Sequence, residues 1–87
     1  MRIGQCVLGA AATQLTTVNR RFAQLVIQNN SADNVRVGDN TVSSTKGILL
    51  NPGGFFDGRL SIARGRLGDY YLFGTAGDVI DYLYEDI

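Results

Sequence analysis

Apolar and polar side chains alternate with a period of two in several short segments of this sequence. In residues 23–28, for example, Leu25 and Ile27 fall on one face of an extended chain while Gln24 and Gln28 fall on the other. This period is typical of a β-strand with one buried face. Clusters of Gly, Asn, Asp and Ser end each segment within a few residues, as turns do. The sequence therefore predicts an all-β chain of short strands.

The same signals place about seven short, mainly antiparallel strands along the chain. We expect them over residues 5–8, 13–18, 23–28, 35–37, 55–56, 69–73 and 79–85. An apolar run over residues 48–50 leads into Asn51-Pro52-Gly53-Gly54, where Pro52 and Gly53 fit the central pair of a type II turn. Regularly spaced short strands favour a single small β-sandwich or barrel spanning residues 1–87.

The sequence also makes predictions about the pairing and secondary structure of particular segments. Residues 23–28 and 35–37 flank a polar loop of six residues, and we expect them to form an antiparallel hairpin. In residues 79–85, Ile80, Tyr82 and Tyr84 share one face of a strand, although an amphipathic helix beginning at Asp78 is the alternative. Residues 1–21 are expected to form an N-terminal arm with short strands, and residues 57–68 an insertion rich in Arg and Gly.

The composition of this chain excludes several common kinds of structural and catalytic site. Its 87 residues include one cysteine, Cys6, and no histidine. An internal disulfide and a structural zinc site are therefore excluded, as is histidine-based acid–base catalysis. We expect no enzymatic activity, no catalytic residues, no metal and no cofactor. The apolar runs are too short for a membrane helix, so no membrane partner is expected, and the chain shows no targeting segment.

The charges cancel overall but are unevenly distributed. Residues 1–68 hold all eight basic residues and three acidic ones, whereas the last 19 residues hold five acidic residues and no basic one. Either the acidic end pairs with its own domain, or it meets the basic body of a neighbouring subunit. The basic residues are scattered along a neutral chain, so nucleic acid is not an expected partner.

Two groups of side chains are candidates for a partner interface. The first consists of three arginines in the glycine-containing insertion, and the second of aromatic and acidic residues near the end of the chain. They are Arg59, Arg64 and Arg66, and Tyr82, Tyr84, Glu85 and Asp86. Tyrosine is enriched at protein interfaces because it offers contact area and a hydroxyl group. A stripe of tyrosines could also bind carbohydrate, which is the alternative use.

The order of strands and turns resembles a known group of proteins. A strand ending in Ile27-Gln28-Asn29-Asn30 leads through a polar turn to Val35-Arg36-Val37-Gly38-Asp39. A Thr/Ser-rich stretch ending at Gly47, an apolar run and the Asn51-Pro52-Gly53-Gly54 turn follow. This order resembles small all-β structural proteins encoded in the virion gene clusters of tailed bacteriophages. The resemblance runs from about Phe22 to Leu83, and residues 57–68 depart from it.

The resemblance implies a non-enzymatic virion protein, made in the host cytoplasm and located on the capsid surface. Its expected role is head decoration, or cementing, through contacts with the major capsid protein or other virion proteins. We expect a homo-oligomer, with a trimer favoured. The alternatives are an accessory protein of the tail, neck or fibre base and, less favoured, a carbohydrate-binding module.

Overall fold

The computed structural model describes residues 2–17, 21–59 and 66–86. These residues form a small β-sandwich of two antiparallel four-stranded sheets, and the only helical element among them is one short 3-10 helix. No helix in the described part of the chain has the length and apolar character needed to cross a membrane. The all-β prediction is confirmed, and residues 79–85 belong to a strand rather than a helix.

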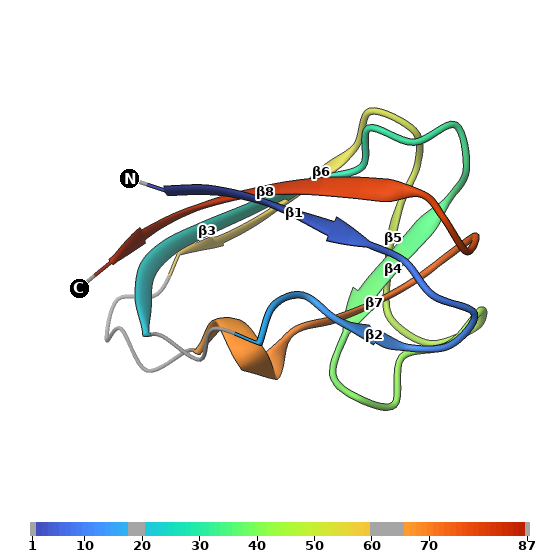
Figure 1. The fold of residues 1–87 in the computed structure, drawn as a ribbon, viewed down its shortest axis with the longest axis horizontal. Helices are drawn as coiled ribbons and strands as arrows, with labels where there is room; N and C mark the ends of the chain where they lie inside the picture. Colours follow the sequence, from blue (N-terminus) through green and yellow to red (C-terminus); the bar gives the residue numbers. More distant parts are fainter. Residues whose placement is uncertain (1, 18–20, 60–65, 87) are drawn as a thin grey trace.

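Sheet A contains both ends of the described chain, and sheet B lies beneath it (Figure 1). The strand order of sheet A is β1 (Arg2–Val7), β8 (Val79–Asp86), β3 (Phe22–Gln28) and β6 (Phe55–Arg59). The order of sheet B is β2 (Thr13–Gln14), β7 (Tyr71–Phe73), β4 (Val35–Gly38) and β5 (Ile48–Leu50). The 3-10 helix η1 (Leu67–Asp69) precedes β7.

The core lies between the two sheets, where the period-two alternation of each strand places its apolar side chains. Leu25, Ile27 and Ile80 enter it from sheet A and are fully buried. Val35 and Leu72 enter it from sheet B and are also fully buried. Truncating such a side chain to alanine typically costs about 2–5 kcal/mol of stability. One end of the core is closed by a ring cluster in which Phe22 and Phe56 both contact Tyr70.

The predicted hairpin between residues 23–28 and 35–37 is wrong, because β3 and β4 lie in different sheets. The loop between them carries the chain across the core, so that the apolar faces of the two strands pack against each other. Asn29 anchors this crossing with a fully buried side chain. Its Nδ2 donates to the carbonyls of Asp33 and Leu50 at 2.7 and 2.9 Å, and its Oδ1 accepts from Ser31.

Several predicted strand boundaries also differ from the structure. β6 continues through Asp57 and Gly58, so the predicted insertion over residues 57–68 begins inside a strand. The strand expected over residues 13–18 is limited to Thr13–Gln14, and the one expected over residues 69–73 begins at Tyr71. Turn residues are tolerated in β6 because it pairs on one side only, with β3.

The turn predicted at Pro52 and Gly53 is confirmed. Gly53 has a φ of 84°, the value that the third residue of a type II turn requires and that residues with a side chain rarely adopt. The N–H of Gly54 closes the turn on the carbonyl of Asn51 at 2.7 Å, and Gly53 also donates to the carbonyl of Asn29. The turn is therefore tied directly to the crossing between the sheets.

Candidate protein interface

The two tyrosines expected at a partner surface point toward the core. Tyr84 is 8% exposed and belongs to the core cluster, and Tyr82 packs against that cluster. Their rings stack with centroids 6.2 Å apart. The expectation that Tyr84 lies on an exposed surface is therefore wrong for the isolated chain, because β8 turns its Ile80–Tyr82–Tyr84 face inward.

The structure describes the positions of only some of the charged residues expected at the interface. Glu85 is exposed on the outer face of β8, opposite Gln24 of β3. The backbones of Arg59 and Asp86 belong to β6 and β8. The backbone of Arg66 forms an isolated antiparallel β-bridge with that of Arg21. Arg64 lies outside the described residues. The structure thus brings Glu85 and Arg59 to the same end of sheet A, since both pair with Gln24.

The outer face of sheet A carries an apolar surface that comes from strands distant in the sequence. Ile3 of β1 lies opposite Leu83 of β8, which in turn lies opposite Val26 of β3. Ile3 is 79% exposed, and the other two side chains are half-buried. A second apolar pair, Val7 and Val79, lies on the same face and is 61% and 39% exposed.

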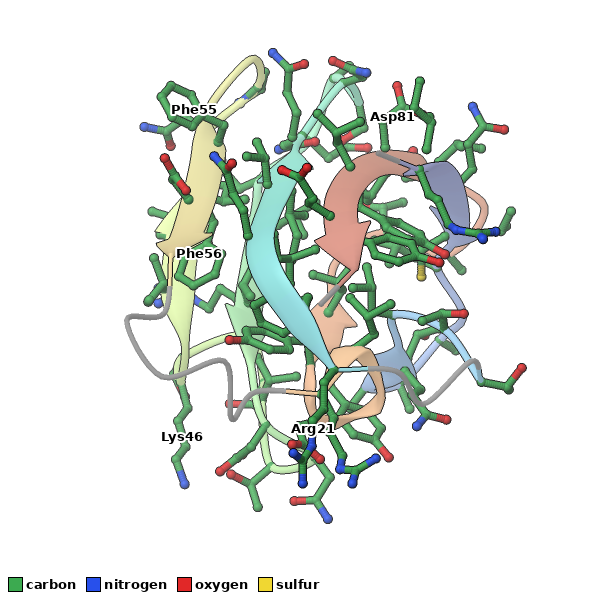
Figure 2. The ribbon with its side chains drawn as sticks, turned by 90° about the vertical axis from the view of Figure 1, so that its left-hand side faces the viewer. Arg21, Lys46, Phe55, Phe56 and Asp81 are labelled. Carbon is green, nitrogen blue, oxygen red and sulfur yellow. The ribbon has the colours of Figure 1, made fainter. Side chains whose placement is uncertain are left out.

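A polar row separates these two apolar rows. It consists of Gln5, Asp81 and Gln28, and it ends at Phe55, whose ring is 64% exposed. Figure 2 shows Asp81 and Phe55 at one end of the molecule, opposite Lys46. The Asp81 carboxylate accepts hydrogen bonds from Gln5 Nε2 at 2.9 Å and from Asn30 Nδ2. We refer to these two apolar rows with their central polar row as the striped face.

The striped face has a hollow along one of its two apolar rows, the row of Ile3, Leu83 and Val26. A hollow of about 670 Å³ is lined by Ile3, Val26 and Leu83, with Gln5, Gln28 and Asp81 beside them. An apolar centre with amides and a carboxylate around it has the composition of a protein-binding surface. Large patches of exposed apolar side chains on one face are also uncommon in monomeric proteins.

Gly4 lets β1 lie flat against the ring of Tyr82. A Cβ atom at this position would come within 2.3 Å of Tyr82 Cζ. The ring therefore covers the inner side of β1 where glycine offers no side chain, an arrangement that compensates for glycine in a strand. The inner side of β1 is thus occupied by its own chain, whereas Ile3, Gln5 and Val7 remain exposed on the outer side.

On the outer face of sheet B, one side chain is bonded to a loop of the same chain, while Leu49 is 45% exposed. Arg36 of β4 donates from Nε to the Ser44 carbonyl at 3.0 Å and from Nη1 to the Gly47 carbonyl at 2.9 Å. Leu49 and Phe73 flank Arg36 on the neighbouring strands. The guanidinium thus fixes the loop that precedes β5.

Two acidic groups in the loops, Asp39 and Asp78, have pKa values that their surroundings shift in opposite directions. Asp39 Oδ1 accepts from the hydroxyl and the N–H of Thr41 at 2.5 and 2.8 Å, which lowers the pKa of the Asp39 carboxyl. The carboxyl of Asp33 beside Asp78 raises the pKa of Asp78, chiefly by hydrogen bonding to its protonated form. Asp78 Oδ2 is shielded and has no hydrogen-bond partner within the described structure.

Other candidate chemistry in the described residues is limited. No group of three or more His, Cys, Asp or Glu side chains within residues 2–17, 21–59 and 66–86 is placed to hold a metal ion. Cys6 is buried in the core, and burial raises the pKa of its thiol, which leaves it a poor nucleophile. No family model, no curated protein and no solved structure matches this chain.

Sequence reasoning missed the striped face as a unit. The alternation of side chains along each strand does indicate its members. Val79 and Leu83 alternate with the core residues of β8, and Ile3 lies on the opposite face of β1 from Gly4 and Cys6. What was missing was the register that places β1 and β3 on either side of β8.

Proposed function

We propose that this chain is a non-enzymatic structural protein of a tailed-phage virion that binds the head lattice as a decoration protein. The observation that carries the proposal is the striped face, with its exposed Ile3 and Val7 around a polar row. The order of strands and turns that resembles small phage virion proteins adds the expected partner, the major capsid protein or a neighbouring virion protein.

The geometry of the striped face suits docking on a protein surface. Its hollow lies along a sheet face, and Asp81 in its polar row is already engaged by the amides of Gln5 and Asn30. That carboxylate is held as a fixed acceptor at the centre of the face. On a repeating lattice, many copies of a modest interface add up to stable attachment, as multivalent binding does.

The packing of the tyrosines favours protein docking over carbohydrate binding. Tyr84 is buried, and Tyr70 and Tyr82 pack against the core cluster, so these rings do not stand free as a stacking platform for sugars. The exposed apolar surface of sheet A is instead largely aliphatic, which is the chemistry of a protein contact.

The test is binding to purified heads that lack this protein. Heads are incubated with the protein and sedimented, and the bound copies per head are counted by quantitative mass spectrometry. Saturable binding of hundreds of copies per head is expected, because decoration follows the lattice. Failure to bind heads, or binding in only a few copies at one vertex, would overturn the decoration role. The second result would instead support an accessory protein of the neck, tail or fibre base.

A further inference from the structure

We propose that β1 pairs with β1 of a second copy of this chain, joining two copies of sheet A into one continuous eight-stranded sheet. The pair is antiparallel and twofold symmetric, with the two Gln5 residues opposite each other. This inference goes beyond the proposed function and does not depend on it, since it concerns the chain's contact with itself.

The backbone groups of β1 point alternately toward β8 and toward the open edge of sheet A. Leu8 N–H donates to the Asp78 carbonyl at 2.9 Å, and the Leu8 carbonyl accepts from Gly77 N–H at 2.8 Å. Backbone groups of successive residues in a strand point to opposite sides. In the observed register, Arg2, Gly4 and Cys6 therefore bond to β8. The N–H and C=O groups of Ile3, Gln5 and Val7 point to the open edge of sheet A.

These outward-pointing groups allow two copies of β1 to pair in a register centred on Gln5. With Gln5 opposite Gln5, Ile3 lies opposite Val7 of the second copy, and Val7 lies opposite its Ile3. Each of these three pairs can exchange two N–H···O=C hydrogen bonds, because all of the groups point toward the partner strand. The most exposed apolar side chains of β1, 79% and 61% exposed, would then meet each other as cross-strand pairs.

The same register continues the striped face across both copies. The row of Ile3, Leu83 and Val26 would run on into Val7 and Val79 of the second copy, by the pairing within each sheet. The polar row of Gln5, Asp81 and Gln28 would meet its own copy. Apolar rows therefore align with apolar rows and polar with polar, which is the self-complementarity that a twofold interface requires.

The other edge strands are less suited than β1 to pairing with a second copy. β2 has two residues and β5 three, and short edge strands resist pairing with other chains. β6 is longer, but Asp57 is exposed on its outward row. Two β6 strands centred on Asp57 would place like charges opposite each other, which is destabilising. β1 has six residues, and its outward row of Ile3, Gln5 and Val7 bears no charge.

A cysteine scan tests both the partner and the register. In a Cys6→Ser background, which removes the chain's one cysteine, Gln5→Cys is expected to give a disulfide-linked dimer on mild oxidation. Residues opposite each other in a hydrogen-bonded pair have Cα atoms about 5.5 Å apart, within disulfide range. Ile3→Cys is the matched control, since its two copies would lie roughly 13 Å apart along the strands.

Phe55→Cys on β6 is a second control, because Phe55 is also exposed and lies on the opposite edge strand of sheet A. Dimer formation by Gln5→Cys, with little by Ile3→Cys and Phe55→Cys, supports the proposal. Absence of the Gln5→Cys dimer, or equal crosslinking at all three positions, overturns it. Neither result alters the head-binding test, so the two proposals fail separately.

A proline pair tests the backbone contact in the uncrosslinked protein. Gln5→Pro removes an N–H that points to the open edge, and Asp57→Pro makes the same change at the edge of β6. Analytical ultracentrifugation over a concentration series is expected to show a dimer that Gln5→Pro weakens at least about tenfold and Asp57→Pro leaves unchanged. A wild-type monomer at about 1 mM, or a trimer insensitive to Gln5→Pro, would contradict the pairing.

Discussion

The outer faces of the two sheets differ in how much apolar surface they expose. On sheet B, Arg36 binds the carbonyls of Ser44 and Gly47, so a loop of the same chain covers part of the face, and Leu49 is 45% exposed. On sheet A, Ile3 and Val7 are exposed, and the apolar rows have no covering segment among the described residues. A sandwich this small can bury only one face of each sheet between its layers. Of the two outer faces, sheet A therefore leaves more large apolar side chains exposed.

The largest expected effect comes from placing a charge in the striped face. Leu83→Lys should weaken binding to heads by about 30-fold or more, because it puts a charge at the centre of an apolar contact. Leu49→Lys on sheet B is the matched control and should change binding by less than about threefold. Binding isotherms measured with both variants, alongside their melting temperatures, check this contrast. Equal losses on the two sheets would break the comparison.

The next effect concerns stability and should appear on sheet B alone. Arg36→Met removes two hydrogen bonds from a charged donor and should lower the free energy of unfolding by about 1–2 kcal/mol. In a domain of this size that corresponds to roughly 5–15 °C in Tm. Binding to heads, measured below the lowered Tm, should stay the same. If Arg36→Met left the Tm unchanged, the loop would not depend on the guanidinium.

A smaller effect distinguishes the loop acids by pH. The pKa of Asp78 is raised, so its contribution to stability is full below its unfolded value of 3.8 and is lost as pH rises through the folded value. Asp78→Asn should therefore stabilise the protein at about pH 7 and flatten this dependence. Asp39 has a lowered pKa, so its contribution is lost as pH falls, and Asp39→Asn should destabilise at neutral pH.

Urea midpoints of the wild type and the two variants, measured across acidic to neutral pH, check these signs. The prediction fails if Asp78→Asn destabilises the protein at neutral pH, because the ionised Asp78 carboxylate would then make a favourable contribution to stability.

The smallest expected effect is that of two arginines within residues 57–68. Reversing Arg64 and Arg66 to Glu should reduce attachment to heads more at low than at high ionic strength, because rim charges act mainly through screened attraction. The expected loss is below about 1 kcal/mol per charge. Head occupancy across a salt series measures it. A loss as large at high salt as at low salt would indicate that these arginines are not rim charges.

Periodicity along the chain predicted which side chains of a strand share a face. It placed Leu25 and Ile27 together and Ile80 with Tyr82 and Tyr84, and the structure confirms both groupings. Periodicity carries no information about which strands are neighbours. The hairpin between residues 23–28 and 35–37 failed for that reason, since a polar loop that reverses the chain and one that crosses a core look alike in sequence.

The candidate interface shows the same limit. Tyr82 and Tyr84 are predicted to contact a partner because tyrosine is enriched at interfaces, but the Tyr82 ring fills the side of β1 that Gly4 leaves empty and stacks on Tyr84. Ile3 and Val26 are far apart in the sequence, and only their shared neighbour Leu83 brings them together. A surface built across strands needs the register, which local patterns do not contain.

The position of β8 also constrains how the protein is made. β8 follows every other strand in the chain, yet it lies between β1 and β3 in sheet A. During synthesis, β1 therefore has no neighbouring strand in its sheet until β8 has left the ribosome. Pairings between distant segments form slowly, and unpaired apolar strands are prone to misassociation while they wait. Rapid production of this chain should consequently favour aggregation of nascent molecules, and slower synthesis at reduced temperature should raise the soluble yield.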